Sequence, residues 1–433
     1  MFSPLETVEH DMCKYGCYMY YEGDNTSICP NPKCKKNCYD NESKAFATVK
    51  QVSLAEQLAL LMSCKTFRNQ IQYKSSRHTV YQNNDSGLLK DVFDGELLRS
   101  SDDPINGCTN LHLAMYSDGF NPFKRGGVNM NIVMFVIMSL SLELRYKKEN
   151  ILVTSIIPGP KKPFDIHSFL HPIYQDLILL EKQGVVVDCS ESIHFSATLE
   201  VVIGDIPGCA ELCYHVGHMA NFGCRLCNIK ATSVTTNSRY FSQNTTGLVV
   251  ERSKDTFVHP ELTIGLKGVS HFVLLKRFHG AYYWGLDEMY LWGANLGPKL
   301  WTKYLELISQ AMQDCQRNVH PNSTDGVFQD IHNKAGHFRS IDRIDFLMYV
   351  LPSTVVEALQ LQKRDVIQKE RKSRTSQMSE IKLRQMETAI DESCRAIVAL
   401  SKACRLCQKY SLSMDEIDEI KRYIIRHCNG VIE

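Results

Sequence analysis

Two aspartates stand at the ends of predicted strands, where they could hold a metal ion. The alternating apolar run 111–117 ends at Asp118, and the run 197–203 is followed, after one glycine, by Asp205. If these strands are neighbours in a sheet, the carboxylates lie side by side, and such hard oxygen ligands suit Mg²⁺. The alternative is that both residues only terminate strands, because aspartate before glycine is common in turns.

Five cysteines stand in the first forty residues, among glycine, asparagine, proline and lysine and without a long apolar period. Such a segment buries little core by itself, and zinc held by four thiolates would supply the missing folding free energy. The spacing predicts that Cys13, Cys17, Cys29 and Cys34 bind zinc, with Cys38 as the substitute ligand. Free thiols in a loop are the alternative, since these spacings are looser than Cys-x2-Cys.

A second group of zinc-type ligands follows Asp205. His218, Cys224 and Cys227 lie close together in the sequence, and His215 stands one helical turn before His218. Zinc bound there would pin the base of an inserted domain to the rest of the core. The spacing does not identify a fourth ligand.

The order of the predicted elements decides whether Asp118 and Asp205 can meet. Three apolar, β-branched runs come first, and the later elements are a helix, a short strand, a strand and a helix: 111–117, 132–139, 151–157, 166–183, 185–188, 197–203 and 210–219. This is the element order of a ribonuclease-H-like core, in which the first and the later strand are neighbours. The sequence therefore predicts an α/β fold with a mixed sheet.

Five segments are predicted along the chain. They are a Cys-rich zinc-binding segment, a helical adaptor, the first part of the α/β core, a large and mostly helical insertion, and C-terminal helices: 1–45, 46–108, 109–230, 231–330 and 331–433. Aromatic residues at helical spacing over 269–312 indicate packed helices rather than a base-stacking surface. The basic stretch 362–384 suits phosphate contacts or, equally, a solvated helix.

The composition excludes several classes of protein but identifies no partner. The 433 residues carry 49 Lys and Arg against 48 Asp and Glu, so a nucleic-acid surface must come from local clustering of charge. No secretory signal opens the chain, and the longest apolar run, 132–142, is shorter than the roughly 18 residues of a membrane-spanning helix. We therefore expect an intracellular protein without a membrane partner, whose 17 cysteines serve zinc sites and core packing.

Five motifs between residues 91 and 230 occur in the order seen in a known family: DVFDGE (91–96), SDGFNPF (117–123), IPGPKKP (157–163), GDIP (204–207) and CRLC (224–227). In these motifs the chain resembles CACTA-type transposases, and its Cys-rich opening resembles the zinc-binding segment of that family. The resemblance implies a ribonuclease-H-like nuclease and strand transferase. Asp118 and Asp205 would be the first two members of its metal-binding acidic triad.

The resemblance also implies cofactors, partners and a location. Mg²⁺ or Mn²⁺ would bind at the acidic triad, and Zn²⁺ at the cysteine groups. The substrate would be DNA at transposon ends, with self-association of the protein in the nucleus. Phosphodiester cleavage and strand transfer would then use two-metal chemistry.

The third member of the triad is a glutamate on a later helix of the family, before an apolar stretch and Leu-Pro. The best match is SIDRIDFLMYVLP (340–352), where Asp342 takes its place and Asp345 is the nearest competitor. We favour Asp342 because the apolar run from Phe346 to Pro352 is then in register with the family pattern, and we expect Asp342 to face the cleft while Ile341 and Phe346 are buried against the sheet.

Two departures from the family keep other functions open. Asp342 replaces the family's glutamate, and Tyr290 stands where the family typically has histidine. The alternative is a domesticated or decayed transposase-derived module that binds DNA or protein without catalysis. A more remote alternative is a ribonuclease acting on RNA–DNA hybrids.

Overall fold

The computed structural model describes residues 5–21, 24, 26–74, 87–99, 109–123, 129–160, 162–235, 238–241, 249–300, 302, 339–372 and 380–430. The chain forms two compact units. The first comprises Met1–Val80 and Ser100–Leu286, and the second comprises Tyr81–Arg99 and Asp287–Glu433. The five predicted segments are finer than these units, and their boundaries stay predictions.

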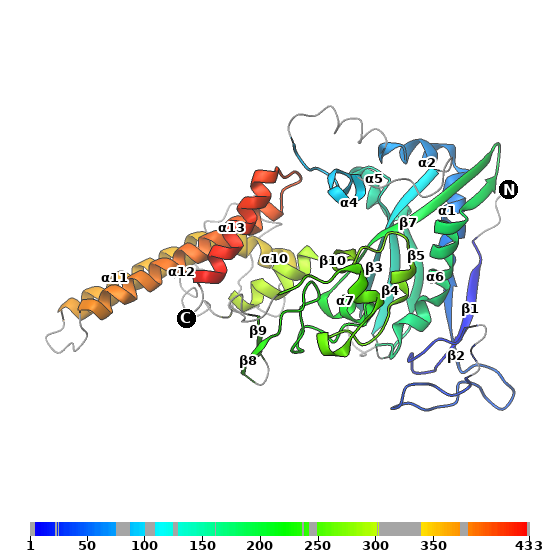
Figure 1. The fold of residues 1–433 in the computed structure, drawn as a ribbon, viewed down its shortest axis with the longest axis horizontal. Coiled ribbons are helices and arrows are strands. Elements are labelled where there is room, and N and C mark those ends of the chain that lie inside the picture. Colours follow the sequence, from blue (N-terminus) through cyan, green and yellow to red (C-terminus); the bar gives the residue numbers. More distant parts are fainter. Residues whose placement is uncertain are drawn as a thin grey trace. The chain divides into compact units, whose positions relative to one another are not determined.

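A mixed sheet of eight strands, counted among the described residues, forms the centre of the first unit (Figure 1). The strand order is β1 (Thr7–Met12), β2 (Ala47–Val52), β5 (Ile151–Ile157), β4 (Met130–Ile137), β3 (Thr109–Phe120), β7 (Ser192–Gly204) and β10 (Trp284–Leu286), while β6 (Val185–Asp188) pairs with β7 outside this path. The neighbours β3, β4 and β5 run antiparallel, whereas β7 runs parallel to both β3 and β10. The predicted α/β class with a mixed sheet is confirmed.

The pairing of β3 with β7 contains a β-bulge. Leu113 pairs with Leu199 and the next residue, Ala114, pairs with Val201, so Glu200 is an extra residue in β7. Before the bulge the odd-numbered residues of β7, such as Leu199, point into the apolar core, whereas after it the even-numbered Val202 does. The core-facing residues of β3 stay odd-numbered throughout.

Helices α1 (Leu54–Ser63) and α6 (Ile166–Lys182) cover the apolar face of the sheet. Helix α6 begins after Asp165, whose side chain caps the first turn. Asp176 of α6 accepts a hydrogen bond from Ser53 Oγ at 2.9 Å, which fixes the start of α1 against α6. The helix predicted from residue 166 is confirmed.

The first unit also contains short elements: α2 (Lys65–Gln70), α5 (Leu142–Arg145), α7 (Ile206–Leu212), the hairpin of β8 (Thr232–Thr235) and β9 (Ser238–Tyr240), α8 (Lys254–Val258), and 3-10 helices at Lys148–Asn150, Leu262–Ile264, His271–Leu274 and Ala281–Tyr283. The described part of the predicted insertion up to residue 286 is less helical than expected, because it contains this hairpin and because β10 extends the sheet. Residues 301 and 303–338 of the predicted insertion and C-terminal helices lie outside the described residues.

The second unit is helical over most of its described residues. Its elements are a 3-10 helix (Val92–Asp94), α4 (Glu96–Arg99), a π-helix (Met289–Leu296), α10 (Ser340–Asp345), a second π-helix (Phe346–Val355), α11 (Val356–Lys372), α12 (Glu380–Cys407) and α13 (Met414–Gly430). Their apolar faces meet in a core that includes Trp292, Phe346, Leu347, Ile397 and Leu400.

One helical stretch of the second unit, Ser340–Lys372, is long and apolar enough to cross a membrane by length and composition alone. Core helices of other proteins satisfy the same two criteria. Here Phe346, Leu347 and Val355 of the stretch are buried among side chains of α12 and of the π-helix at Met289–Leu296. The apolar part of the stretch, Phe346–Val355, therefore packs into the core of the second unit.

Candidate functional site

The carboxylates of Asp118 and Asp205 belong to the ends of two paired strands. Strands β3 and β7 run parallel, and Tyr116 opposite Ile203 is their last registered pair. Two residues further on, the same register brings Asp118 beside Asp205, at the spacing of about 4.8 Å between neighbouring strands. The register therefore supports the predicted meeting of these residues, while their binding of metal stays a prediction.

Local structure explains how each aspartate is held at this edge. Asp118 is exposed, and its Oδ1 accepts the N–H of the next residue at 2.8 Å. Asp205 is the N-cap of α7, and its Oδ1 accepts the N–H of Gly208 at 2.5 Å. A Cβ on Gly204 would lie 3.1 Å from Ser117 O, so glycine at this position lets the two strand ends approach closely.

The predicted third carboxylate, Asp342, lies in the second unit near the start of α10. Its Oδ1 accepts a hydrogen bond from Arg339 Nη2 at 2.8 Å, and its Oδ2 accepts one from Arg339 N at 2.9 Å. Burial would raise the pKa of Asp342, but the hydrogen bonds and charge of Arg339 outweigh it and lower that pKa. The expectation that Ile341 is buried is wrong, because this side chain at the helix surface is 37% exposed. Phe346 is buried, but in the helical core of the second unit.

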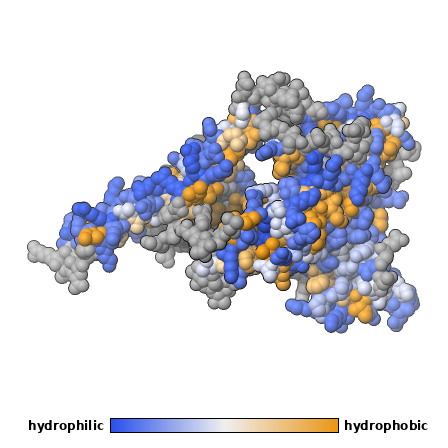
Figure 2. Space-filling view, viewed as in Figure 1, coloured by the Kyte–Doolittle hydropathy of each residue, from blue (hydrophilic) through white to orange (hydrophobic). Residues whose placement is uncertain are grey.

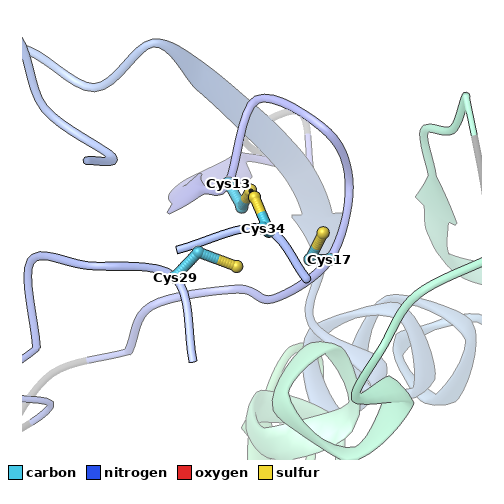
Figure 3. Close-up of side chains that lie close together, drawn as sticks. All are labelled: Cys13, Cys17, Cys29 and Cys34. Atoms are coloured by element: carbon cyan, nitrogen blue, oxygen red, sulfur yellow. Dashed lines mark hydrogen bonds between the residues drawn. The ribbon is translucent and has the colours of Figure 1, made fainter. Parts of the chain in front are cut away.

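Four cysteines of the N-terminal segment converge on one point. The sulfurs of Cys13, Cys17, Cys29 and Cys34 all lie within 4.8 Å of one another (Figure 3). The Sγ atoms of Cys13 and Cys34 are 3.7 Å apart. Four thiolates at about 2.3 Å from a tetrahedral zinc ion lie about 3.8 Å from one another, so the cluster has the dimensions of such a site. These cysteines cluster and could bind a metal such as zinc.

Cys38 packs beside this cluster but is not one of its four members. Its Sγ forms a hydrogen bond with Tyr20 OH instead, so the predicted substitute ligand is already engaged. Asn31 Nδ2 lies 3.3 Å from Cys17 Sγ and can donate to it, as groups around metal-bound sulfur often do. Burial raises the pKa of the Cys17 thiol to about 11, and the Asn31 hydrogen bond acts against this rise.

The second predicted zinc group is only partly brought together. Cys224 Sγ and Cys227 Sγ lie 3.4 Å apart, but His218 is exposed, and within the described residues no third ligand atom completes a cluster with this pair. His215 is buried nearby; its Nδ1 accepts a backbone N–H at 3.1 Å, and burial lowers its pKa to about 4. Zinc binding by His218, Cys224 and Cys227 stays a prediction.

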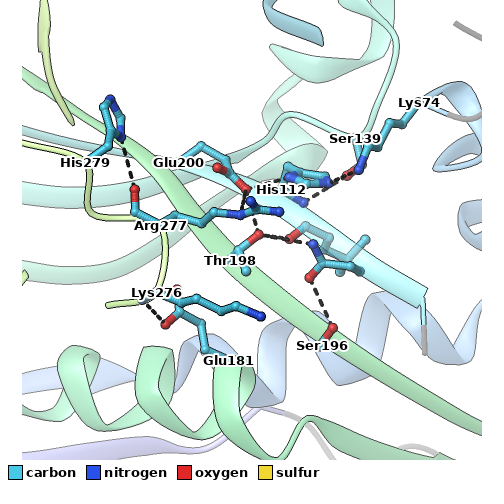
Figure 4. A network of polar contacts seen from close by, with 12 residues as sticks. Lys74, His112, Ser139, Glu181, Ser196, Thr198, Glu200, Lys276, Arg277 and His279 are labelled. Carbon is cyan, nitrogen blue, oxygen red and sulfur yellow. Dashed lines mark hydrogen bonds and ion pairs between the residues drawn. The ribbon is translucent and has the colours of Figure 1, made fainter. Parts of the chain in front are cut away.

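A buried polar network lies between β3 and β7 and was missed by reasoning from sequence (Figure 4). His112 Nδ1 lies 2.6 Å from Glu200 Oε1, and Lys74 Nζ lies 2.8 Å from His112 Nε2. Thr198 Oγ1 donates to Glu200 Oε1 at 2.7 Å, and Arg277 Nε lies 3.6 Å from the same oxygen. Burial would raise the pKa of Glu200, but the hydrogen bond and charge of His112 outweigh it and lower that pKa. The available signal was polar residues at alternate positions of two otherwise apolar strands.

Glu181 of α6 gives the first unit a distinct pH dependence. Its Oε2 accepts the N–H of Lys276 at 2.8 Å, and burial raises its pKa from 4.5 to about 7. Because the folded carboxyl keeps its proton to higher pH than the unfolded one, its stabilising contribution is complete below about pH 4.5 and is lost as pH rises through 7. Gln at this position stays neutral at every pH. As the pH rises from 4.5 to about 7, the native chain should therefore lose about 3 kcal/mol of unfolding free energy relative to Glu181→Gln.

Urea denaturation of both proteins from pH 5 to pH 8 measures this difference. Glu143→Gln, at an exposed position of α5, is the matched control and should leave the pH dependence unchanged. The prediction would be contradicted if the unfolding free energies of the native chain and Glu181→Gln changed with pH in the same way.

Another strand-end aspartate was passed over. Asp287 directly follows β10, and its Oδ1 accepts the N–H of Tyr290 at 3.0 Å at the start of a π-helix. The signal that singled out Asp118 and Asp205, an aspartate directly after a strand, applies to this residue too. A strand of three residues is too short to be predicted from alternation, which hid the signal.

The segment that contains Asp118 and Asp205 is similar to a known protein family. Residues 93–245 match the model of a family described as transposase family tnp2. No curated protein matches the chain. Asp118, Asp205 and the Cys224–Cys227 pair all lie within the matched range. This segment is therefore similar to transposase family tnp2, which supports a transposase-like function on DNA.

Proposed function

We propose that the protein is a CACTA-type transposase that cleaves and joins DNA with a ribonuclease-H-like core. The observation that carries the proposal is the parallel pairing of β3 with β7, because it brings Asp118 and Asp205 to neighbouring strand ends within the transposase-like segment. The order β5-β4-β3-β7-β10 supports such a core, since three consecutive antiparallel strands are followed by two strands parallel to β3.

The residues at this edge have the chemistry of a divalent-metal site. Asp118 is exposed, and Asp205 uses Oδ1 to cap α7, which leaves its Oδ2 for other contacts. Carboxylate oxygens are the ligands that Mg²⁺ and Mn²⁺ prefer. When bound, two such ions stabilise the attacking and leaving oxygens of a phosphodiester. Asp118 and Asp205 would hold them, and Asp342 is the proposed third carboxylate.

The remaining parts of the proposal concern the structural metal and the partners. We infer that Cys13, Cys17, Cys29 and Cys34 hold Zn²⁺, supported by the spacing of their sulfurs. DNA at transposon ends is the proposed substrate, and a nuclear location follows from it. Self-association is proposed as well, from the resemblance to CACTA-type transposases.

Nicking of a supercoiled plasmid by the purified full-length chain tests the catalytic function. We expect nicked and linear products when Mg²⁺ or Mn²⁺ is added and none when it is omitted. The ion should be omitted rather than chelated, because a chelator would also remove zinc from the cysteine cluster. A chain that binds the plasmid but leaves it intact with both ions would refute catalysis.

A non-catalytic, transposase-derived DNA- or protein-binding module is the second candidate. An ion pair favours this candidate: Arg339 neutralises the carboxylate of Asp342, the residue that stands where the family has glutamate. Tyr290 in place of histidine favours it too. This candidate predicts DNA or protein binding that does not depend on Mg²⁺.

A further inference from the structure

A cavity of about 270 Å³, lined by both charged and apolar side chains, lies between α11, α12 and α13 of the second unit. Its size is close to the lower bound of ligand clefts, about 300 Å³. The side chains that matter for its chemistry are Gln360 of α11, Asp391, Arg395 and Lys402 of α12, and Tyr423 and Arg426 of α13. On the face seen in Figure 2 the surface of α11 and α12 is largely hydrophilic.

Helical spacing explains why cationic side chains meet here. Arg395 and Lys402 are seven residues apart on α12 and therefore share one face, and Tyr423 and Arg426 are three residues apart on α13. Lys402 Nζ lies 5.5 Å from the centre of the Tyr423 ring, in a cation–π contact. His427 Nδ1, 3.1 Å from Ala396 O, fixes α13 against α12.

The cavity has an excess of positive charge. Its carboxylate, Asp391, accepts hydrogen bonds from Lys363 Nζ at 2.7 Å and from Gln360 Nε2 at 3.2 Å, so it is already neutralised by α11. Arg395, Lys402 and Arg426 form no ion pair within the part of the chain that the structure describes. Three cationic side chains therefore face a cavity whose negative charge is satisfied from elsewhere.

The basic stretch 362–384 differs from the cavity because some of its arginines form ion pairs within the protein. Glu380 Oε1 lies 3.7 Å from Arg371 Nη2 and 3.6 Å from Arg384 Nε, so one carboxylate partly offsets the charge of these two arginines. Exposed ion pairs of this kind leave less net charge for a partner. The cavity, rather than the whole stretch 362–384, is the better place for an anion.

We propose that this cavity binds phosphate groups of a DNA backbone. Arginine guanidinium groups bind phosphate with two parallel hydrogen bonds, and lysine adds a point charge. The Tyr423 ring offers an apolar face beside them for a sugar or an unpaired base. The choice of DNA as the source of the phosphate rests on the proposed function. Binding should be independent of base sequence, because phosphate contacts position a protein without reading bases.

Binding of the full-length chain to a fluorescein-labelled duplex, measured against salt concentration without Mg²⁺, tests the proposal. Each bound phosphate contributes about 0.9 to the slope of log K against log salt, so Arg395→Ala/Arg426→Ala should reduce the slope by about 2. At 0.1 M salt the affinity should fall roughly eightfold for each phosphate that the variant no longer binds. Arg395→Lys/Arg426→Lys keeps both charges and should keep most of the slope.

The matched control is Lys421→Ala/Arg422→Ala, which removes two exposed cations of α13 outside the cavity. A slope that is unchanged in the cavity variant, or reduced equally in the control, overturns the proposal. So does a native chain that binds no DNA, or a cavity variant that loses affinity for inorganic pyrophosphate but not for DNA. If the cavity variant behaves as expected while plasmid nicking fails, only the catalytic function is refuted.

Discussion

Asp205→Asn is expected to abolish Mg²⁺-dependent DNA cleavage without unfolding the protein. Asparagine caps a helix as well as aspartate does, so the hydrogen bond to Gly208 N and the start of α7 should survive. The amide removes the charge that a divalent ion needs, and loss of the metal removes stabilisation of both reacting oxygens. We expect the same loss for Asp118→Asn and Asp342→Asn, of at least about 1,000-fold in single-turnover nicking rate.

Asp345→Asn separates this interpretation from a general effect on α10. Asp345 is only 7% exposed, so its replacement can lower stability, but the remaining folded protein should cleave at the native rate. The exposed ion pair that Asp342→Asn breaks with Arg339 contributes at most about 1 kcal/mol, so that variant should remain folded. Asp342 would not be the third ligand if Asp342→Asn cleaved DNA at the native rate. The same conclusion would follow if Asp345→Asn lost cleavage when compared at the same folded fraction.

Cys29→Ser is expected to lose one zinc ion per chain and to unfold the N-terminal segment. Structural zinc sites contribute about 10–16 kcal/mol of apparent binding free energy, which a small Cys-rich segment cannot replace by burial of apolar area. Elemental analysis under reducing conditions measures the metal, and limited proteolysis measures the unfolding. The first cleavages in the variant should then fall within residues 5–46.

Cys38→Ser is the matched control, because Cys38 is equally buried and bonds to Tyr20 but is not one of the four clustered cysteines. It should keep its zinc. Equal zinc content in the native chain and Cys29→Ser would contradict the assignment, as would loss of zinc on changing Cys38. Strands β3, β4 and β7 have their own apolar core, so we expect them to stay folded in both variants.

The central strands and α6 could be predicted from the sequence because their apolar residues follow one strong period. The run 132–139 became β4 and 151–157 became β5, since β-branched side chains buried on a sheet leave little ambiguity. The edge strand β1 (TVEHDM) is mostly polar and could not be recognised, because its pairing with β2 rather than burial of its side chains makes it a strand.

The candidate site could be predicted only where ligands are close in sequence or follow a predicted strand. The four N-terminal cysteines were found from spacing, because a tetrahedral thiolate site needs little besides two close pairs. The surroundings of Asp342 were predicted less well: Ile341 faces outward because the helix uses Ile344 and Phe346 for the core. The His112–Glu200 pair depends on the register of two strands 88 residues apart, which one sequence does not specify.

The β-bulge at Glu200 also determines on which side of the sheet Asp205 emerges. If the same residues formed a strand without a bulge, an odd-numbered position after Leu199 would share the side that faces α6. With the bulge, Asp205 and Asp118 emerge on the opposite side together. Deleting Glu200 would therefore restore a regular strand and leave Asp205 beside Asp118, whereas deleting Val202 with the bulge kept would turn Asp205 to the side that faces α6. The carboxylate pair depends in this way on a strand irregularity that the pairing of β7 with β3 can accommodate without loss of the sheet.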